Sequence, residues 1–330
     1  MRDRPLGNCL GALVIAWTTC NPVAASADAR AVDLVQHMLV ALKSLDYDGI
    51  FVYQHADNLD TLRVIHRGSG RAESERIITL SGPRREIIRE GNRVTVKLAA
   101  DHAVLVEEHQ PRESLGRGFT GSGQEFGARY RFQLENIDRV AGRSAQIVQI
   151  TPETADRYSY RLWIDQASGL PLKSMIVDLD GQPLEQEQFA TVTVGVPPSD
   201  EDFKSELLGS DFVWYVREET PVPEHAAGQR DNWRVAWLPT GFVQHRNLTR
   251  HLATSRLPVR HFVYSDGLAT VSVFIEKLGG DASPLVGDSN LGAVNVFSRL
   301  IDHHQVTVVG EMPRTMVRQI AASVAPQTLE

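Results

Sequence analysis

The chain has 330 residues, of which 42% are hydrophobic and 23% are charged, and its formal net charge is -7. This length exceeds the roughly 100 to 200 residues of a usual single domain, so we expect two domains. The composition is that of a folded globular protein, which excludes a disordered or fibrous chain. An acidic balance without a basic domain excludes the usual signature of a nucleic-acid-binding protein.

The first 27 residues have the order of a secretory signal peptide. Arg2 and Arg4 precede an apolar run over residues 10–17, and small residues follow up to Ala27. The apolar run is shorter than the ~20 residues that a membrane-spanning helix needs. We therefore expect export of the chain and removal of residues 1–27.

Both cysteines, Cys9 and Cys20, lie within that segment. The mature chain would then have no thiol, which excludes disulfides, cysteine-bound zinc, iron–sulfur clusters and a cysteine nucleophile. Such a chain must be stabilised by core burial alone, and its size permits this.

An amphipathic helix is predicted over residues 30–45. Val32, Val35, Leu39 and Leu42 recur at spacings of three and four residues, which places them on one helix face. We expect this face to pack against the sheet that follows.

The stretch 47–98 consists of short apolar, β-branched runs separated by Gly, Pro, Asn or Asp, which is typical of an antiparallel meander. Gly91 and Asn92 both tolerate positive φ, so we expect a two-residue hairpin turn there. The register of this turn pairs Glu90 with Arg93, Glu86 with Lys97 and Ile87 with Val96. It predicts a charged, solvated face and a mostly apolar face.

Five basic residues of this stretch form a dense cluster in an otherwise acidic chain: Arg84, Arg85, Arg89, Arg93 and Lys97. They could bind the phosphates of a lipid or the acidic surface of a partner. The alternative is a solvated strand face with local ion pairs, each contributing about 1 kcal/mol or less. Composition alone favours the solvated face. Arg85 and Arg89 fall on the apolar side of the hairpin, so they lie at its rim or the register is shifted by one.

A further strand is predicted over residues 103–107, and a glycine-rich loop over residues 113–127. Loops of this length are uncommon in compact domains and are often functional. A phosphate-binding loop is excluded, because no Gly-Lys-Ser/Thr end and no strand-to-helix context accompany the glycines.

Strand patterns return from residue 132 to residue 194, so we expect the first domain, residues 28–200, to be a large antiparallel sheet with few helices. Proline and acidic residues over 201–230 predict a linker. The apolar segment 212–216 within it must be buried against either domain or a partner.

The second domain is predicted over residues 231–326 as a small α+β module. Strand patterns occupy 260–264, 270–275, 293–300 and 305–309, and a helix is expected after Pro313. The fold class is therefore α+β, with a large curved sheet and a smaller C-terminal domain.

No catalytic or metal-binding motif is present in the sequence. The 11 histidines lack metal-ligand spacing. Nucleophile-elbow, kinase and dinucleotide-binding patterns are also absent. We therefore expect a binding protein without a cofactor rather than an enzyme.

Several ordered motifs resemble the RseB/MucB family over nearly the whole mature chain. They are Ser81–Arg89 with Gly91-Asn92, Arg157–Asp165 with Ser168–Lys173, Asp180-Gly181 with Leu184–Gln186, Trp237–Phe242, Tyr264–Leu268 and Val308–Pro313. The resemblance implies a periplasmic regulator that binds the periplasmic part of a membrane anti-sigma factor of the RseA or MucA type. It implies protection of that factor from the site-1 protease, and release on sensing lipopolysaccharide or mislocalised lipoprotein. It also implies a first domain similar to the lipoprotein carriers LolA and LolB.

We also single out candidate partner- or lipid-binding residues. They are the five basic residues above and four aromatic residues of the predicted strands, Phe51, Tyr53, Trp163 and Trp214. The alternative function is a periplasmic carrier of lipid or lipoprotein that has no anti-sigma partner, in which the second domain would be dispensable. The sequence leaves the oligomeric state open.

Overall fold

The computed structural model describes residues 23–68, 73–108, 129–207, 212–217, 233–251, 258–279 and 283–326. The predicted glycine-rich loop 113–127, and residues 1–22 of the predicted signal peptide, lie outside the described residues. Among the described residues no helix is long and apolar enough to cross a membrane.

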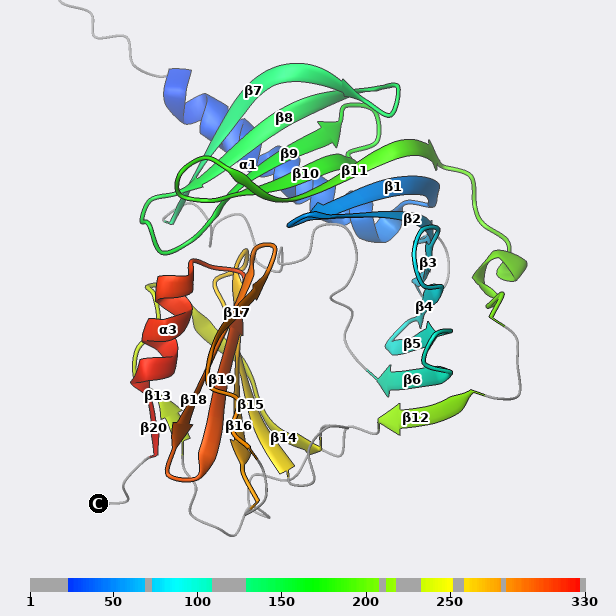
Figure 1. The fold of residues 1–330 in the computed structure, drawn as a ribbon. Coiled ribbons are helices and arrows are strands. Elements are labelled where there is room, and N and C mark those ends of the chain that lie inside the picture. The colour runs from blue at the N-terminus through cyan, green and yellow to red at the C-terminus, as the bar shows by residue number, and fades with distance from the viewer. Residues whose placement is uncertain are drawn as a thin grey trace, which may run out of the picture.

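A curved twelve-stranded sheet forms the first domain (Figure 1). Its strands are β1 (Tyr47–His55), β2 (Asn58–Arg67), β3 (Ser74–Thr79), β4 (Arg85–Glu90), β5 (Arg93–Leu98), β6 (Ala103–Glu108), β7 (Tyr130–Val140), β8 (Arg143–Pro152), β9 (Ser159–Asp165), β10 (Pro171–Val177), β11 (Pro183–Val194) and β12 (Val213–Arg217). Their spatial order is β12-β6-β5-β4-β3-β2-β1-β11-β10-β9-β8-β7. All pairs are antiparallel except β12 with β6. The meander predicted over 47–98 is confirmed by the consecutive pairing of β1 to β5.

One helix, α1 (Val23–Ser44), packs on one face of this sheet. Its buried residues are Ala31, Val35, Met38, Ala41 and Leu42. The predicted helix is confirmed, but its buried stripe is shifted, because Val32 and Leu39 are only half-buried. Met38 is fully buried in the core, whereas Leu39 packs against the edge of the same cluster.

The β4–β5 hairpin has the predicted register, with Glu86 opposite Lys97 and Ile87 opposite Val96. The expectation that its charged face is solvated is wrong, since the side chain of Glu86 is only 1% exposed. The segment Asp200–Leu207, with the short 3-10 helix η1 (Asp200–Phe203), lies over that face. The Glu206 backbone amide donates to Glu86 Oε1 at 3.1 Å, and Lys97 Nζ donates to the Leu207 carbonyl at 3.1 Å.

The second domain contains a six-stranded antiparallel sheet in the order β14-β15-β16-β19-β18-β17. Its elements are β13 (Trp233–Val235), β14 (Val243–His251), β15 (Pro258–Ser265), β16 (Thr270–Lys277), β17 (Gly287–Leu291), β18 (Val294–Ile301), β19 (His304–Gly310), α3 (Arg314–Ser323) and β20 (Val324–Pro326). The predicted helix α3 buries Val317, Ile320 and Ala321 against the sheet. Both domains are mostly β-structure in the described residues, so the predicted α+β class holds only loosely.

The predicted linker contains ordered structure. Residues Val213–Arg217 form β12, which extends the large sheet beyond β6. Among the described residues neither domain buries Val213, Trp214 and Tyr215, which remain 54%, 57% and 49% exposed, so burial against a partner stays a prediction.

A buried ion pair joins the two domains. Arg157, in the turn before β9, donates through Nε to Asp266 Oδ2 at 2.5 Å, and the Tyr130 hydroxyl donates to the same oxygen at 2.9 Å. Burial, with the charge of Asp266, raises the pKa of the Tyr130 hydroxyl well above its usual value, so it remains a donor. Asp266 lies in the β15–β16 turn, and the next apolar residue, Leu268, is fully buried in the core beneath α1.

We predict that Asp266→Ala lowers the free energy of unfolding by about 3 to 5 kcal/mol, because it removes the acceptor of two buried donors, Arg157 Nε and the Tyr130 hydroxyl. Urea denaturation measures the change. Glu153→Ala is the control, since it breaks an Arg131–Glu153 pair whose side chains are 55% and 48% exposed. In the control, the free energy of unfolding should fall by about 1 kcal/mol or less. Equal losses in the two variants would contradict this role for Asp266.

Candidate binding pocket

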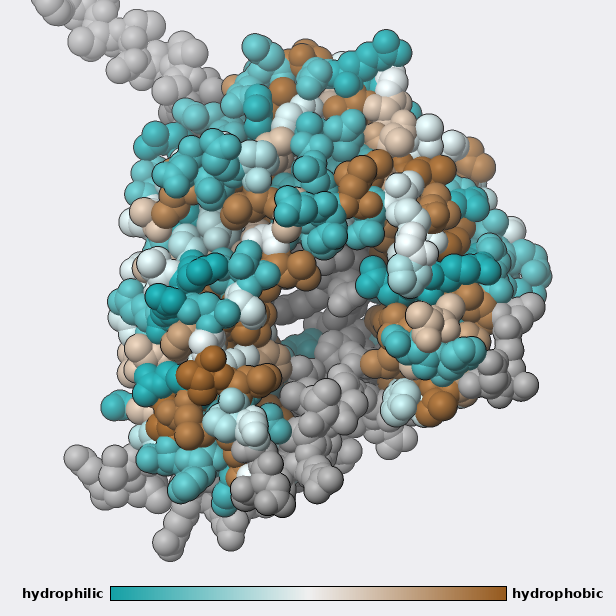
Figure 2. All heavy atoms as spheres, in the orientation of Figure 1, coloured by the Kyte–Doolittle hydropathy of each residue, from teal (hydrophilic) through white to brown (hydrophobic). Residues whose placement is uncertain are grey.

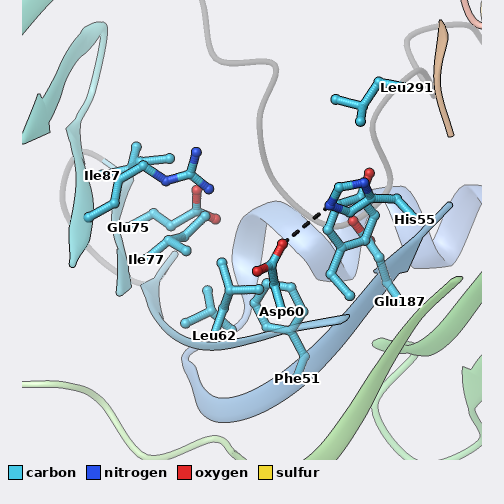
Figure 3. A pocket seen from close by; sticks show the side chains of 12 residues that line it. Phe51, His55, Asp60, Leu62, Glu75, Ile77, Ile87, Glu187 and Leu291 are labelled. Atoms are coloured by element: carbon cyan, nitrogen blue, oxygen red, sulfur yellow. Dashed lines mark hydrogen bonds and ion pairs between the residues drawn. The ribbon is translucent and has the colours of Figure 1, made fainter. Parts of the chain in front are cut away.

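A cavity of about 370 Å³ lies where the large sheet meets the second domain (Figure 3). Its walls come from β1 to β4, β11 and β17. The lining residues are Phe51, Tyr53, His55, Asp60, Leu62, Val64, Glu75, Ile77, Arg85, Ile87, Glu187 and Leu291. Leu291 is the contribution of the second domain, and Figure 3 shows it across the cavity from the sheet residues.

The floor of the pocket is apolar. Phe51, Leu62, Val64, Ile77 and Ile87 are each less than 10% exposed. They share one face because residues opposite each other across neighbouring strands point the same way, as Phe51 does with Leu62 and Ile77 with Ile87. Leu42 of α1 belongs to the same buried cluster.

A polar rim lies along β1 and β2. The Tyr53 and His55 rings stack at a centroid distance of 4.7 Å, and His55 Nε2 lies 3.2 Å from Asp60 Oδ2 (Figure 3). Glu187 faces Tyr53 from β11. Arg85 is exposed and is the basic residue of the lining set. The opening of the pocket is therefore polar and mostly acidic above an apolar floor.

A buried charged cluster supports the wall formed by β3 and β4. Arg89 is 2% exposed, and its Nη1 lies 3.4 Å from Glu75 Oε1 and 3.7 Å from Glu73 Oε1. The hydrogen bond from His66 lowers the pKa of Glu73. The His66 ring also stacks on Tyr47 at 4.6 Å. These contacts hold Glu75 at the edge of the pocket. They also neutralise the charge of Arg89 within the core, so Arg89 is not directed to a ligand.

Glu185 connects the pocket rim to the second domain. Its Oε2 accepts from the Tyr53 hydroxyl at 2.9 Å, and its Oε1 accepts from the backbone amide of Ala293 at 2.8 Å. Ala293 follows Leu291 and Gly292 in the β17–β18 turn. Gly292 has φ +56°, and a Cβ atom there would lie 2.4 Å from Glu185 Oε1. Glycine at this position lets the turn approach the carboxylate closely.

The structure brings only some of the sequence-predicted site residues together. Phe51, Tyr53 and Arg85 line the pocket. Arg84 is exposed and lies 3.7 Å from Glu206, Arg93 is exposed, and Lys97 is half-buried under Leu207.

The two predicted tryptophans lie elsewhere. Trp163 is 4% exposed, donates from Nε1 to Asp138 at 2.9 Å and has Lys173 Nζ 4.5 Å above its ring. Trp214 is exposed on β12, at the outer edge of the sheet.

Sequence reasoning did not single out His55, Asp60, Glu187 or Leu291. The period of a strand could have found His55, because Phe51, Tyr53 and His55 alternate along one face. Leu291 carries no such signal, since only the docking of the second domain brings it to the pocket. Among the described residues, no group of three His, Cys, Asp or Glu side chains could hold a metal ion.

Comparison with known proteins gives two family models in order along the chain. The MucB/RseB N-terminal domain matches residues 30–207, and the MucB/RseB C-terminal domain matches residues 227–325. The sigma factor AlgU regulatory protein MucB of Pseudomonas aeruginosa is 33% identical over 92% of this chain and 94% of its own. The sigma-E factor regulatory protein RseB of Escherichia coli K12 is 27% identical over 91% of this chain and 92% of its own.

Solved structures of the same family also resemble this chain over most of its length. The Pseudomonas aeruginosa MucA/MucB complex has a TM-score of 0.70 at 29% identity, and covers 91% of this chain and 100% of the solved chain. A second structure, MucB in complex with MucA(peri), has a TM-score of 0.69 at 30% identity with the same coverage.

We predict that Gly292→Ala displaces Glu185 and exposes the Ala293 amide. Hydrogen exchange at Ala293 should become faster, because the added Cβ occupies the position of the acceptor. Gly82→Ala is the matched control, since Gly82 has φ +72° but no neighbour within 4 Å of its Cβ position. Both variants carry the left-handed backbone penalty of roughly 1 to 2 kcal/mol. Unchanged exchange at Ala293 in Gly292→Ala would show that the contact does not depend on this glycine.

Proposed function

Because the chain belongs to the MucB/RseB family, we propose that it regulates a sigma factor of the AlgU or sigma-E type by binding the periplasmic region of a membrane anti-sigma factor. The observation that carries this proposal is the match of both domains, in order, to MucB in complex with MucA(peri). The bound regulator would shield the anti-sigma factor from the site-1 protease. The chain would act in the periplasm, as a binding protein and not as an enzyme.

The pocket supports a second part of the proposal, the sensing of lipid. An apolar floor suits an acyl chain, since each buried CH₂ contributes about 0.8 kcal/mol. A volume of about 370 Å³ is near the lower end of the ~300 to 1,000 Å³ of small-molecule sites. The pocket would therefore take one acyl chain of lipopolysaccharide or of a mislocalised lipoprotein, and the acidic rim would meet the polar group next to it.

Exposed basic residues outside the floor are proposed to contact phosphates or the partner. Arg84, Arg85 and Arg93 are exposed, and the Arg84–Glu206 pair is 60% exposed on both sides, so it holds Arg84 only weakly. Tyr53 and Phe51 would contact the acyl chain in the pocket. The buried residues Arg89 and Trp163 are assigned to the stability of the sheet instead.

A lipid carrier without an anti-sigma partner is the competing function, and it treats the second domain as dispensable. The buried Arg157–Asp266 pair and the burial of Leu268 in the first domain's core favour a two-domain unit. Removal of the second domain would take away two acceptors of the buried Arg157, the Asp266 carboxylate and the Thr240 carbonyl, which is strongly unfavourable.

We predict that the mature chain slows cleavage of its anti-sigma factor's periplasmic domain by the site-1 protease, and that lipopolysaccharide reverses the protection. The measurement is the cleavage rate of the purified MucA-like domain of the same organism. An unchanged rate with and without the chain would contradict the regulatory function. If the chain still slows cleavage in the presence of lipopolysaccharide and of acylated lipoprotein, only the proposed lipid sensing is contradicted.

We predict that Arg84→Glu with Arg85→Glu weakens binding of the anti-sigma domain or of lipopolysaccharide by about tenfold, since two reversed charges remove about 1.4 kcal/mol or more at a partly desolvated contact. Calorimetry measures both affinities. Arg139→Glu is the control, because Arg139 is exposed on β7 at the other end of the sheet. If the double variant binds both ligands with the affinity of the control, Arg84 and Arg85 are solvated surface residues without a role in binding.

A further inference from the structure

The outermost strand of the large sheet, β12, has features of a docking edge. It pairs in parallel with β6 from Val213↔Ala103 to Arg217↔Glu107 without a bulge. In the described part of the chain, no strand pairs with its other side (Figure 1). An unbroken edge of this kind presents a row of backbone donors and acceptors that another strand can use.

The hydrogen bonding of β12 shows which backbone groups are directed outward. The Val213 amide donates to the His102 carbonyl at 2.8 Å, so Val213 is bonded toward β6. In a parallel ladder, alternate residues bond to the same neighbour. The amide and carbonyl of Trp214 therefore point away from β6, toward the open edge.

The side chains of β12 are apolar on both faces of the sheet. Trp214 is 57% exposed on one face, and Val213 and Tyr215 are 54% and 49% exposed on the other. Edge strands are normally protected by charged side chains, proline or a bulge; β12 has no proline and no bulge, and its one charged residue is Arg217 at its end. Large exposed aromatic residues are instead enriched at interfaces.

Figure 2 shows hydrophobic residues, in brown, on the part of the large sheet that carries β4 to β6. Half-buried apolar residues on the same sheet face, Val96, Leu98 and Leu105, lead from the pocket residue Ile87 toward Tyr215.

We propose that β12 is a docking edge at which an extended segment of the anti-sigma factor adds as a further strand of the large sheet. This rests on the proposed function, and it assigns a surface and a binding mode to that partner. Main-chain hydrogen bonds would supply affinity, and alternate apolar side chains of the segment would pack on Trp214 and on Tyr215.

The charges around β12 indicate which kind of partner segment could bind there. The residues that flank β12 in the sequence are Asp211 on one side and Glu218 and Glu219 on the other, against the single basic residue Arg217. A partner strand with basic residues at its ends is therefore favoured. Pairing with a second copy of β12 would bring two net-negative sets of flanking residues together, which is unfavourable.

The test compares Trp214→Pro with Trp214→Val in the full mature chain. Proline removes the outward amide of residue 214 but leaves the inward amide of Val213, and proline is tolerated at a strand edge with its missing donor facing outward. Valine keeps the outward amide and a high β-propensity while it removes the indole ring. Binding of the anti-sigma factor's periplasmic domain is measured by calorimetry.

We expect Trp214→Pro to weaken binding at least tenfold. The loss of affinity in Trp214→Val should be several times smaller than the loss in Trp214→Pro. Hydrogen exchange on the unsubstituted protein is the second measurement, which does not depend on folding of a variant. The Trp214 amide should become protected when the partner binds.

Wild-type affinity in Trp214→Pro, or an unprotected Trp214 amide in the complex, would overturn the docking edge while leaving the proposed function intact. A dimer that forms without the partner and is lost in Trp214→Pro would assign the edge to a second copy instead. No binding by the unsubstituted protein would contradict both the edge and the proposed function.

Discussion

The arrangement of the two domains depends on one buried charge. Arg157 is 2% exposed, and burial of a guanidinium without partners is costly. Its Nε donates to Asp266, its Nη1 to Asp156 and its Nη2 to the Thr240 carbonyl, so both domains satisfy it together. Neither domain could present this junction to water without rearrangement. The junction in turn places the β17–β18 turn over the sheet, and the pocket is complete only with Leu291 from that turn.

The curved sheet has two differently covered faces. On the face that carries the pocket, α1 and the second domain bury the apolar floor. On the opposite face, the segment Asp200–Leu207 covers Arg76 and Glu86, whose ion pair of 3.1 Å is almost fully buried. A charged strand face thus becomes interior because the chain returns over it. The cover lies over β3 to β5, on the side of the sheet away from the pocket.

Local patterns predicted most of the fold, and long-range contacts account for what they missed. The turn chemistry of Gly91 and Asn92 was enough to predict the register of β4 and β5, since hairpin register is a local property. The burial of Glu86 was not predictable, because the segment that covers it, with the backbone amide of Glu206, lies about 120 residues further along the chain. β17, with its sequence Gly-Asp-Ser-Asn-Leu, has no apolar alternation and was missed for that reason. In the pocket, Phe51 and Tyr53 could be singled out because they lie on a predicted strand, whereas Leu291 reaches the pocket only through the docking of a distant hairpin.

The two oxygens of Glu185 serve two different domains, one through Tyr53 and one through Ala293. This shared acceptor makes pocket occupancy and domain contact thermodynamically reciprocal. A ligand that draws the Tyr53 hydroxyl away from the carboxylate changes the free energy of the Ala293 contact. Separation of the domains must then change the affinity for that ligand by the same factor. A single carboxylate thus links the rim of the pocket to the contact between the two domains.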